Sequence, residues 1–204
     1  MKVLILGGFL GSGKTSVLLP LAKYLYANSS GEGNRVAIIE NEIGDVSIDG
    51  ITLRNAGLSV QELFSGCICC TLGTELIGGL MELQEKEKPE WVIIESTGVA
   101  CPGAVAENIS RYIKSITEMH IAVICDAQRL TRLLRAITQI APQQIKDAED
   151  LLLNKIDLVD EQTLIEAEAT LREFNKEAPI FRICAKDGID DAVFAAIIGG
   201  EKNA

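Results

Sequence analysis

The sequence predicts an α/β fold in which a mostly parallel central sheet carries helices on both faces. Along the 204 residues, short runs rich in Val, Ile and Leu alternate with longer amphipathic segments, as in buried strands joined by crossover helices. Hydrophobic residues make up 48% of the chain and aromatic residues only 4%, which suits an aliphatic sheet covered by helices. The length is sufficient for one such domain, spanning 1–204, and short for two.

A glycine-rich segment follows the first strand, which is expected at residues 3–6. A buried strand, a glycine-rich turn and a helix are the context of a phosphate-binding P-loop, so the fold class is that of the P-loop NTPases. Backbone N–H groups of such a loop surround an anion, and the following helix adds its partial positive charge. The segment fits GxxxxGK[ST] and consists of Gly8, Phe9, Leu10, Gly11, Ser12, Gly13, Lys14 and Thr15.

Two residues of the P-loop are expected to act through their side chains. Lys14 reaches the β and γ phosphates, and the Thr15 hydroxyl ligates Mg²⁺. A glycine-rich hairpin with an incidental lysine is the alternative, and the strand and helix on either side disfavour it.

The next elements are a helix over 14–28 and a strand over 35–40, joined by a loop rich in Ser and Gly. The helix places Val17, Leu18, Leu21 and Leu25 on one face. Pro20 lies inside it and is expected to kink it.

An acidic segment comes off the end of that second strand, where ligand-binding loops lie in open α/β sheets. Its carboxylates are Glu40, Glu42, Asp45 and Asp49. Beside a nucleotide pocket, such hard oxygen ligands suit Mg²⁺ and borderline metals. A solvated acidic loop is the alternative, since that is the usual role of a run of charges.

Three cysteines follow within four positions, at Cys67, Cys69 and Cys70. Thiolates bind Zn²⁺, Cu⁺ and related ions strongly, and clustered thiols in a bent turn can converge on one ion. We expect one or two of them to ligate a metal, with the acidic segment supplying the missing ligands. Small buried hydrophobes and a redox pair are the alternatives.

A third buried strand, over 91–95, ends in Glu95 and is followed by Ser96-Thr97-Gly98. This placement matches a Walker B carboxylate that bonds to a Mg²⁺-bound water, with Gly98 sensing the γ phosphate. Before it we expect a short strand over 58–63 and an amphipathic helix over 71–87, which Lys88-Pro89 ends.

The remaining elements continue the alternation of strands and helices. Helices are expected over 102–116 and 128–140, with another turn starting at Ala141-Pro142, and over 160–174 and 190–198. Strands are expected over 120–126, 150–153 and 179–183. His120, the only histidine, is expected to be a packing or surface residue rather than a ligand.

The motif Asn154-Lys155-Ile156-Asp157 follows the strand over 150–153, about 140 residues after the P-loop. A carboxylate at Asp157 can accept bonds from the ring N–H and the exocyclic amine of guanine, while Asn154 can donate to the other edge. Adenine lacks that pair of donors, so the motif predicts GTP or GDP as the ligand. Lys155 belongs to the motif, and the loop with Ala185 and Lys186 is expected to pack on the base.

Charge and cysteine content limit the partners and the compartment. A formal net charge of −10 repels nucleic acid and anionic membranes, so neither is expected as a partner. The apolar N-terminal run is too short for a signal peptide and leads into the P-loop, and no segment has the length of a membrane span. Six cysteines without a disulfide pattern indicate reduced or metal-bound thiols, and hence the cytoplasm.

With these motifs together, residues 1–190 resemble a CobW-type GTPase, related to the nickel-insertion GTPases of hydrogenase and urease maturation. The resemblance rests on GGFLGSGKT, ENEIGDVSIDG, SGCICCTL, VIIESTG and NKID, in the family's order. It implies a metallochaperone in which GTP binding and hydrolysis drive delivery of Zn²⁺, Co²⁺ or another transition metal to a client protein or cofactor pathway. It also implies a nucleotide- or metal-dependent homodimer.

Carried over by position, the resemblance places phosphate and Mg²⁺ at residues 11–15 and guanine at Asn154 and Asp157. It places the family's metal at Glu40, Cys69 and Asp45, where Glu is commoner than Asp. The family's usual C-terminal domain and a histidine-rich tract are both expected to be missing. Cys101 stands where the family tends to have Asp, and is either an extra thiol ligand or a small buried residue; we favour the second.

The resulting hypothesis is a slow GTPase whose nucleotide state rearranges a metal site through the segments 40–49 and 67–70. One alternative is a GTP-dependent activator of a corrinoid or other metalloenzyme, acting by contact with its client. Another is a non-catalytic metal-sensing module that uses nucleotide as a structural ligand.

Overall fold

The computed structural model describes residues 1–29, 36–40, 59–62 and 72–199. Its centre is a seven-stranded sheet in the order β3-β2-β4-β1-β5-β6-β7, and every pairing in it is parallel. The strands are β1 (Lys2–Gly8), β2 (Val36–Glu40), β3 (Ser59–Glu62), β4 (Trp91–Glu95), β5 (Glu118–Asp126), β6 (Asp150–Asn154) and β7 (Ile180–Arg182). The predicted P-loop NTPase fold class is therefore confirmed, with a sheet that is parallel throughout.

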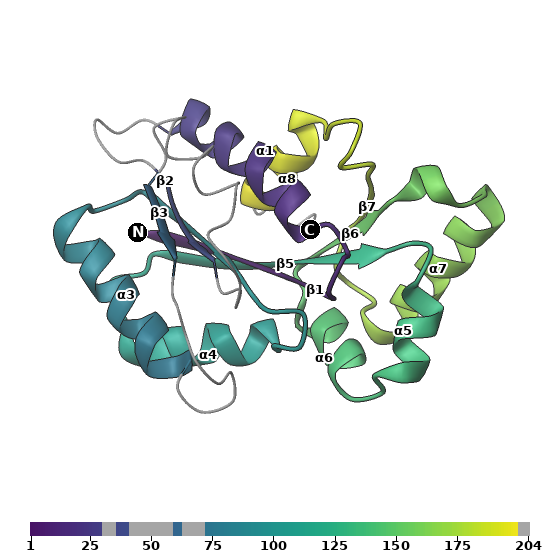
Figure 1. The fold of residues 1–204 in the computed structure, drawn as a ribbon, viewed down its shortest axis with the longest axis horizontal. Helices are drawn as coiled ribbons and strands as arrows, with labels where there is room; N and C mark the ends of the chain where they lie inside the picture. Colours follow the sequence, from purple (N-terminus) through teal and green to yellow (C-terminus); the bar gives the residue numbers. More distant parts are fainter. Residues whose placement is uncertain (30–35, 41–58, 63–71, 200–204) are drawn as a thin grey trace.

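Helices cover both faces of the sheet, as Figure 1 shows. One face carries α1 (Lys14–Asn28) and α8 (Asp191–Gly199), which pack on alternate strand residues such as Leu4, Ile38 and Ile93. The other face packs on the intervening residues, such as Val3, Ala37 and Leu151. Its helices are α3 (Leu72–Lys86), α4 (Pro102–Tyr112), α5 (Leu130–Ala136), α6 (Ile140–Asp147) and α7 (Glu161–Phe174).

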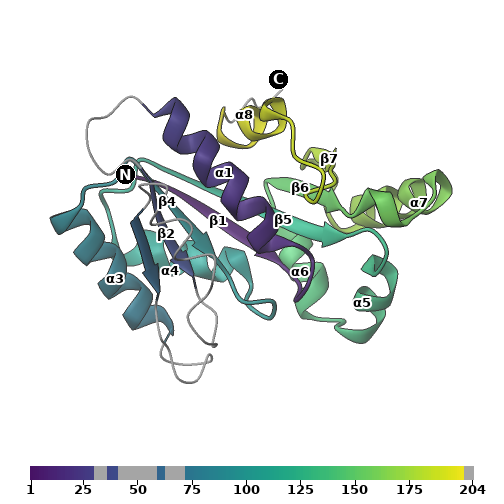
Figure 2. The ribbon, with the colours of Figure 1, turned by 45° about the horizontal axis from the view of Figure 1, so that its top comes forward.

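The strand register brings the predicted motifs to one edge of the sheet. Because the strands are parallel, β1, β2, β4, β5 and β6 all have their carboxyl ends at the same edge, which Figure 2 shows from a second side. Glu95 pairs with Leu6 on one side and with Glu40 on the other. Asp126 pairs with Asn154. The side chains that follow these strand ends therefore surround one crevice.

Most predicted elements lie where the sequence placed them, and two predictions were wrong. The helix over 102–116 ends at Tyr112. The helix over 128–140 is instead the shorter α5, and α6 is a separate helix that holds Pro142 in its first turn, where the missing N–H is tolerated. The late start of α5 has a local cause, because the Asp126 carboxylate accepts bonds from the backbone N–H groups of Gln128 and Arg129.

Helix α1 runs through Pro20 as one continuous helix, with Val17, Leu18, Leu21 and Leu25 all buried. In the described part of the chain, no helix is both long and apolar enough to cross a membrane.

Candidate functional site

The P-loop connects β1 to α1 and has the backbone conformation of an anion cradle. Gly8, Gly11 and Gly13 all adopt positive φ values, of 135°, 72° and 100°. A side chain at Gly13 would also collide, since its Cβ would lie 2.4 Å from Nδ2 of Asn154. Gly13 caps α1 without a side-chain bond, and the first turn carries no acidic residue. The N-terminal N–H groups of α1 can therefore bind an anion.

On the side of the pocket nearest β4, the P-loop side chains meet the Walker B acid. The Thr15 hydroxyl lies 3.4 Å and 3.5 Å from the two carboxylate oxygens of Glu95, which is itself buried. These distances are long for an O–H···O bond, whereas two such oxygens suit a shared hydrated cation. Nζ of Lys14 lies 3.4 Å from the Phe9 carbonyl oxygen.

A buried hydroxyl in this loop supports the binding of phosphate and Mg²⁺ at the pocket. Ser12 is buried, and its Oγ has no hydrogen-bond partner among the residues that the structure describes. A buried hydroxyl without a partner is costly, and an incoming phosphate oxygen would accept its bond. Thr15 and Glu95 are the residues that would hold Mg²⁺.

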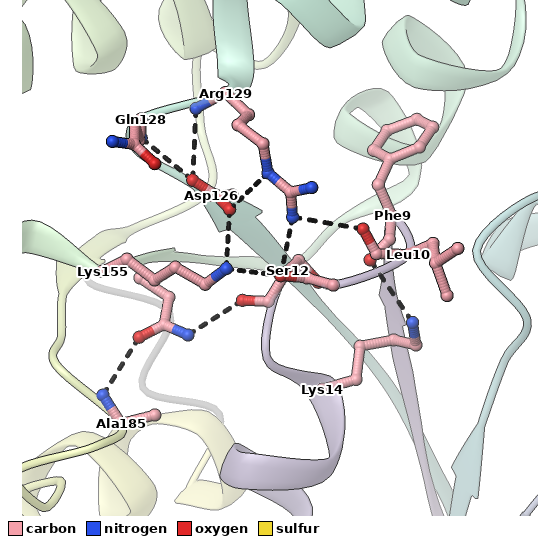
Figure 3. A network of polar contacts seen from close by, with 11 residues as sticks. Phe9, Leu10, Ser12, Lys14, Asp126, Gln128, Arg129, Lys155 and Ala185 are labelled. Atoms are coloured by element: carbon pink, nitrogen blue, oxygen red, sulfur yellow. Dashed lines mark hydrogen bonds and ion pairs between the residues drawn. The ribbon is translucent and has the colours of Figure 1, made fainter. Parts of the chain in front are cut away.

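On the opposite side, Asp126 holds two cations against the P-loop (Figure 3). Its carboxylate is buried and accepts bonds of 2.8 Å from Nζ of Lys155 and from Nε of Arg129. Burial by itself raises the pKa of the Asp126 carboxyl, but these two donors outweigh burial and hold that pKa below its usual value. Both cations then donate to the P-loop backbone, Lys155 to the Gly11 carbonyl at 2.6 Å and Arg129 to the same carbonyl at 2.8 Å.

Asn154 bonds to two loops of the protein. The structure commits its Nδ2 to the Ser12 carbonyl at 2.8 Å, and its Oδ1 accepts from the Ala185 backbone N–H at 3.0 Å. Its side chain is buried and bonds to both the P-loop and the loop that begins at Cys184. Asn154 therefore ties the two loops together, and its donation to the guanine edge stays a prediction.

Asp157 lies in a short 3₁₀ helix (Ile156–Leu158) and is exposed, as is Lys186. An exposed carboxylate at this edge is open to a ligand, so its pairing with guanine stays a prediction, as does the packing of Ala185 and Lys186 on the base. Lys155, which directly precedes this 3₁₀ helix, has a φ of 65°, which is uncommon for a residue with a side chain. The unusual backbone lets Lys155 reach back to the P-loop while Asp157 stays outside.

Gly98 lies in the loop between β4 and α4, residues 96–101, which we call the switch loop. A Cβ at Gly98 would lie 2.6 Å from the Leu10 backbone nitrogen, so only glycine allows this loop to approach the P-loop so closely. Gly98 therefore lies against the P-loop, and its role in sensing the γ phosphate stays a prediction.

Most predicted transition-metal ligands lie outside the described residues. This applies to Asp45, Cys67, Cys69 and Cys70, and to the side chain of Glu40, whose backbone ends β2. Within residues 1–29, 36–40, 59–62 and 72–199, no group of three or more His, Cys, Asp or Glu side chains is arranged to hold a metal ion.

The described cysteines have the properties of protonated thiols. Burial raises the pKa of the Cys125 thiol to about 12, and burial with the nearby Asp147 charge raises that of Cys101. A hydrogen bond to Asp187 raises the pKa of Cys184. A protonated thiol is a poor metal ligand, which favours the structural interpretation of Cys101.

His120 lies near the start of β5, at the sheet edge opposite the P-loop. Its Nδ1 lies 2.7 Å from a carboxylate oxygen of Glu149, and its Nε2 contacts Asp150. Both ring nitrogens are thus engaged in ion pairs within the protein, as expected of a packing residue.

Sequence reasoning missed Asp126 and Arg129. Asp126 had a detectable signal, because it ends a buried strand as Glu95 and Asn154 do. Arg129 had none, since its contact with the P-loop spans more than 100 positions of the chain.

Comparison with known proteins places this site in a family. A family model described as CobW/HypB/UreG, nucleotide-binding domain, matches residues 2–182. A zinc-regulated GTPase metalloprotein activator 1 of Dictyostelium discoideum is 29% identical over 89% of this chain and 45% of its own length. The zinc chaperone YjiA of Escherichia coli strain K12 is 28% identical over 92% of this chain and 58% of its own length. The chain thus spans about half the length of the curated relatives it matches.

Solved structures have the same fold. The hydrogenase maturation factor HypB of Archaeoglobus fulgidus superimposes with a TM-score of 0.70 at 16% identity, covering 98% of this chain and 89% of that protein. The Zn(II)-bound YjiA GTPase of E. coli superimposes with a TM-score of 0.65 at 23% identity, covering 93% of this chain and 59% of that protein. At these identities the likeness concerns the fold alone.

Proposed function

Because the chain belongs to the CobW/HypB/UreG nucleotide-binding domain family, we propose that it binds and slowly hydrolyses GTP. Its nucleotide state would control the binding and delivery of a transition metal, with Zn²⁺ or Co²⁺ as the first candidates. The relatives' names, zinc chaperone and zinc-regulated GTPase metalloprotein activator, support zinc in particular.

One observation carries the coupling between nucleotide and metal. Strand β2 pairs with β4 so that Glu40 stands next to Glu95. The predicted metal segment therefore leaves the sheet directly beside the acid that would hold Mg²⁺. A conformational change at the phosphate side of the pocket therefore needs to be transmitted across only one strand spacing, about 4.8 Å, to affect Glu40.

The described residues have distinct roles in this proposal. Backbone N–H groups of the P-loop and of the first turn of α1 bind the phosphates, and Lys14 neutralises their charge. Thr15 and Glu95 hold Mg²⁺, which supplies charge stabilisation to the β and γ phosphates. The Asp157 carboxylate selects guanine by accepting from its two N–H donors. Gly98 places the switch loop beside the P-loop, where it can respond to the γ phosphate.

A second reading has its own support in the name of a relative. A GTP-dependent activator would act by contact with a metalloprotein client, and its own metal site would be regulatory; the relative of D. discoideum is named a zinc-regulated GTPase metalloprotein activator. A client metalloprotein or cofactor-assembly enzyme is the partner in either case, and a nucleotide- or metal-dependent homodimer is part of the proposal. A non-catalytic metal-sensing module is the third reading.

The first experiment is a titration of Zn²⁺ and Co²⁺ into the reduced protein with GDP, and again with a non-hydrolysable GTP analogue. We expect Co²⁺–thiolate absorption and a metal affinity that differs between the two nucleotides. The Cys69→Ala variant should lose the absorption band. Cys125→Ala is the matched control, because that thiol is buried in the core and should leave the band unchanged.

Equal metal affinity with both nucleotides would refute the coupling. Tight nucleotide binding without a thiolate band would favour the activator reading, particularly if client activation survives in Cys69→Ala. A wild-type protein that binds GTP but shows no turnover with metal and client present would favour the sensing module.

Guanine selection is tested separately with Asp157→Asn. The asparagine amide would donate where the carboxylate accepted, so the variant should lose affinity for GTP and gain it for XTP, whose base has a carbonyl in place of the exocyclic amine. Equal affinity of the wild-type protein for ATP and GTP would refute the base assignment.

A further inference from the structure

Gln144 on α6 is a fully buried polar residue that contacts the switch loop. Its Nε2 donates to the Ala100 carbonyl at 2.6 Å and to the Gly98 carbonyl at 3.2 Å. The opposite amide orientation would turn Oε1 toward two carbonyl oxygens, so the hydrogen bonds define which atom is the nitrogen. One side chain thus holds both ends of the segment 98–100.

Asp147, one turn further along α6, holds the start of α4. Its Oδ2 accepts from the Gly103 backbone N–H at 3.0 Å. Pro102 has no N–H and Cys101 caps α4 with no side-chain bond, so Asp147 supplies from another helix the acceptor that α4 lacks at its own N-terminus. Gln144 fastens the switch loop to α6 at two points, and Asp147 adds a third bond to the start of α4 directly after it.

The unpaired polar atoms of the site point to a second arrangement of this loop. Over the part of the chain that the structure describes, three buried side-chain oxygens have no hydrogen-bond partner: Ser12 Oγ, Thr97 Oγ1 and Gln144 Oε1. All three belong to the P-loop, the switch loop or the residue that holds it. Buried oxygens without partners are rare and costly, and their concentration here indicates a loop that gains hydrogen bonds when it moves or binds a ligand.

We propose that Gln144 is a positioning residue for the γ phosphate response. By holding the Gly98 and Ala100 carbonyls, it fixes the switch loop against the P-loop, and Asp147 fixes the start of α4 behind it. This inference rests on the proposed function, since it assigns the restraint on the loop through which GTP and GDP would be distinguished. GDP has no γ phosphate, so its binding does not depend on where the switch loop is held.

The test compares two affinities in one variant. Gln144→Met keeps the length of the side chain and removes both donors. We expect it to weaken binding of a non-hydrolysable GTP analogue about tenfold and to change GDP binding less than about twofold. Isothermal titration with each nucleotide measures both values. Gln139→Met, an exposed glutamine just before α6, is the matched control and should change neither.

A pH readout separates positioning from a merely structural role. In Gln144→Glu, an ionised carboxylate faces two carbonyl oxygens, whereas its protonated form can donate one bond. Relative to wild type, affinity of Gln144→Glu for the GTP analogue should therefore recover partly on acidification, while the Gln144→Met ratio stays constant. Asp147 is partly exposed, so we expect Asp147→Ala to fold. It should weaken binding of the GTP analogue by a smaller factor than Gln144→Met does.

Equal losses for GDP and the GTP analogue, or no loss for either, would overturn the role of Gln144. A wild-type protein that binds neither nucleotide would instead refute the proposed function. In that case hydrogen exchange of the nucleotide-free protein decides: faster exchange of the amides at 97–103 in Gln144→Met supports the restraint, and unchanged exchange overturns it. If Gln144→Met does not fold, hydrogen exchange and nucleotide titration of Asp147→Ala test the restraint on the loop instead.

Discussion

Among the described residues, the two sides of the nucleotide pocket differ in the lengths of their polar contacts. The base side consists of Asp126, Arg129, Asn154 and Lys155, and the contacts described above that hold it to the P-loop are 2.6–2.8 Å long. The phosphate side consists of Ser12, Lys14, Thr15 and Glu95. There the contacts of Thr15 with Glu95 are 3.4 and 3.5 Å, and the Ser12 hydroxyl has no hydrogen-bond partner in the described part of the chain.

This difference indicates which side is already organised before a ligand arrives. The base side shapes the P-loop from outside by binding its carbonyl groups, which leaves the N–H groups of the loop for an anion. On the phosphate side, phosphate oxygens and a cation would give the Ser12 and Thr15 hydroxyls closer partners. A preorganised base side reduces the ordering cost of binding, while these two hydroxyls leave contacts for the γ phosphate and Mg²⁺ to complete.

The largest expected effect is on the base side. Asp126→Asn removes the negative charge between Lys155 and Arg129 and should lower the free energy of unfolding by about 3 kcal/mol, since breaking a buried ion pair leaves its partners uncompensated. Urea denaturation measures the change. Asp160→Asn, at the exposed N-cap of α7, is the control and should cost little because asparagine also caps helices. Equal stability of the two variants would contradict the structural role of the base side.

The phosphate side should respond in binding rather than in stability. Lys14→Met keeps the apolar stem, so its effect on binding should exceed its effect on unfolding: GTP affinity should fall roughly a hundredfold through loss of charge-assisted phosphate bonds. Nucleotide titration and thermal unfolding give the two values. Lys23→Met, on the exposed part of α1, should alter neither. A marked loss of stability in Lys14→Met would remove the contrast between the sides.

A matched pair of alanine substitutions sharpens the comparison. Asn154→Ala leaves the Ser12 carbonyl and the Ala185 N–H without their partner and should cost about 1–3 kcal/mol of unfolding free energy. Ser12→Ala removes an oxygen that has no partner, so stability should be unchanged or slightly higher. Chemical denaturation of both variants without nucleotide tests this. A larger loss for Ser12→Ala would show that its hydroxyl is paired in the free protein.

The smallest expected effect is on protein stability at acidic pH. Because the pKa of Asp126 lies below its usual 3.8 in the folded protein, its contribution to stability is complete above pH 3.8 and is lost as pH falls through the lowered pKa. Stability curves of wild type and Asp126→Asn should therefore converge in strong acid. Parallel curves over the whole range would mean that Asp126 titrates normally.

The sequence predicted the fold better than it predicted the contacts within the site. Strand positions and the P-loop follow from local patterns of apolar residues and glycines, and the parallel sheet then gathers Glu95, Asp126 and Asn154 at one edge. Which side chains bond to one another at that edge depends on contacts between segments that are far apart in the sequence. Asn154 bonds the Ser12 carbonyl because Gly13 allows its amide to approach to contact, a fact that no local pattern contains.

Two further misses have the same origin. The pattern over 128–140 is compatible with one helix, but the Asp126 side chain takes up the N–H groups where that helix would begin. Gln144 looks like an ordinary helix residue in the sequence, and its importance appears only when α6 lies beside the switch loop.

The bonds from Asn154 and Lys155 to the P-loop span 142 and 144 positions of the chain, which has a consequence for synthesis on the ribosome. The P-loop is among the first segments made, yet the residues that shape it follow on the order of ten seconds later at ordinary elongation rates. Until then, the nascent chain has a phosphate loop without its outer support. We expect tight nucleotide binding to begin only after the segment around Ala185 has emerged from the ribosome. Bound GTP would therefore mark nascent chains in which the P-loop has its outer support.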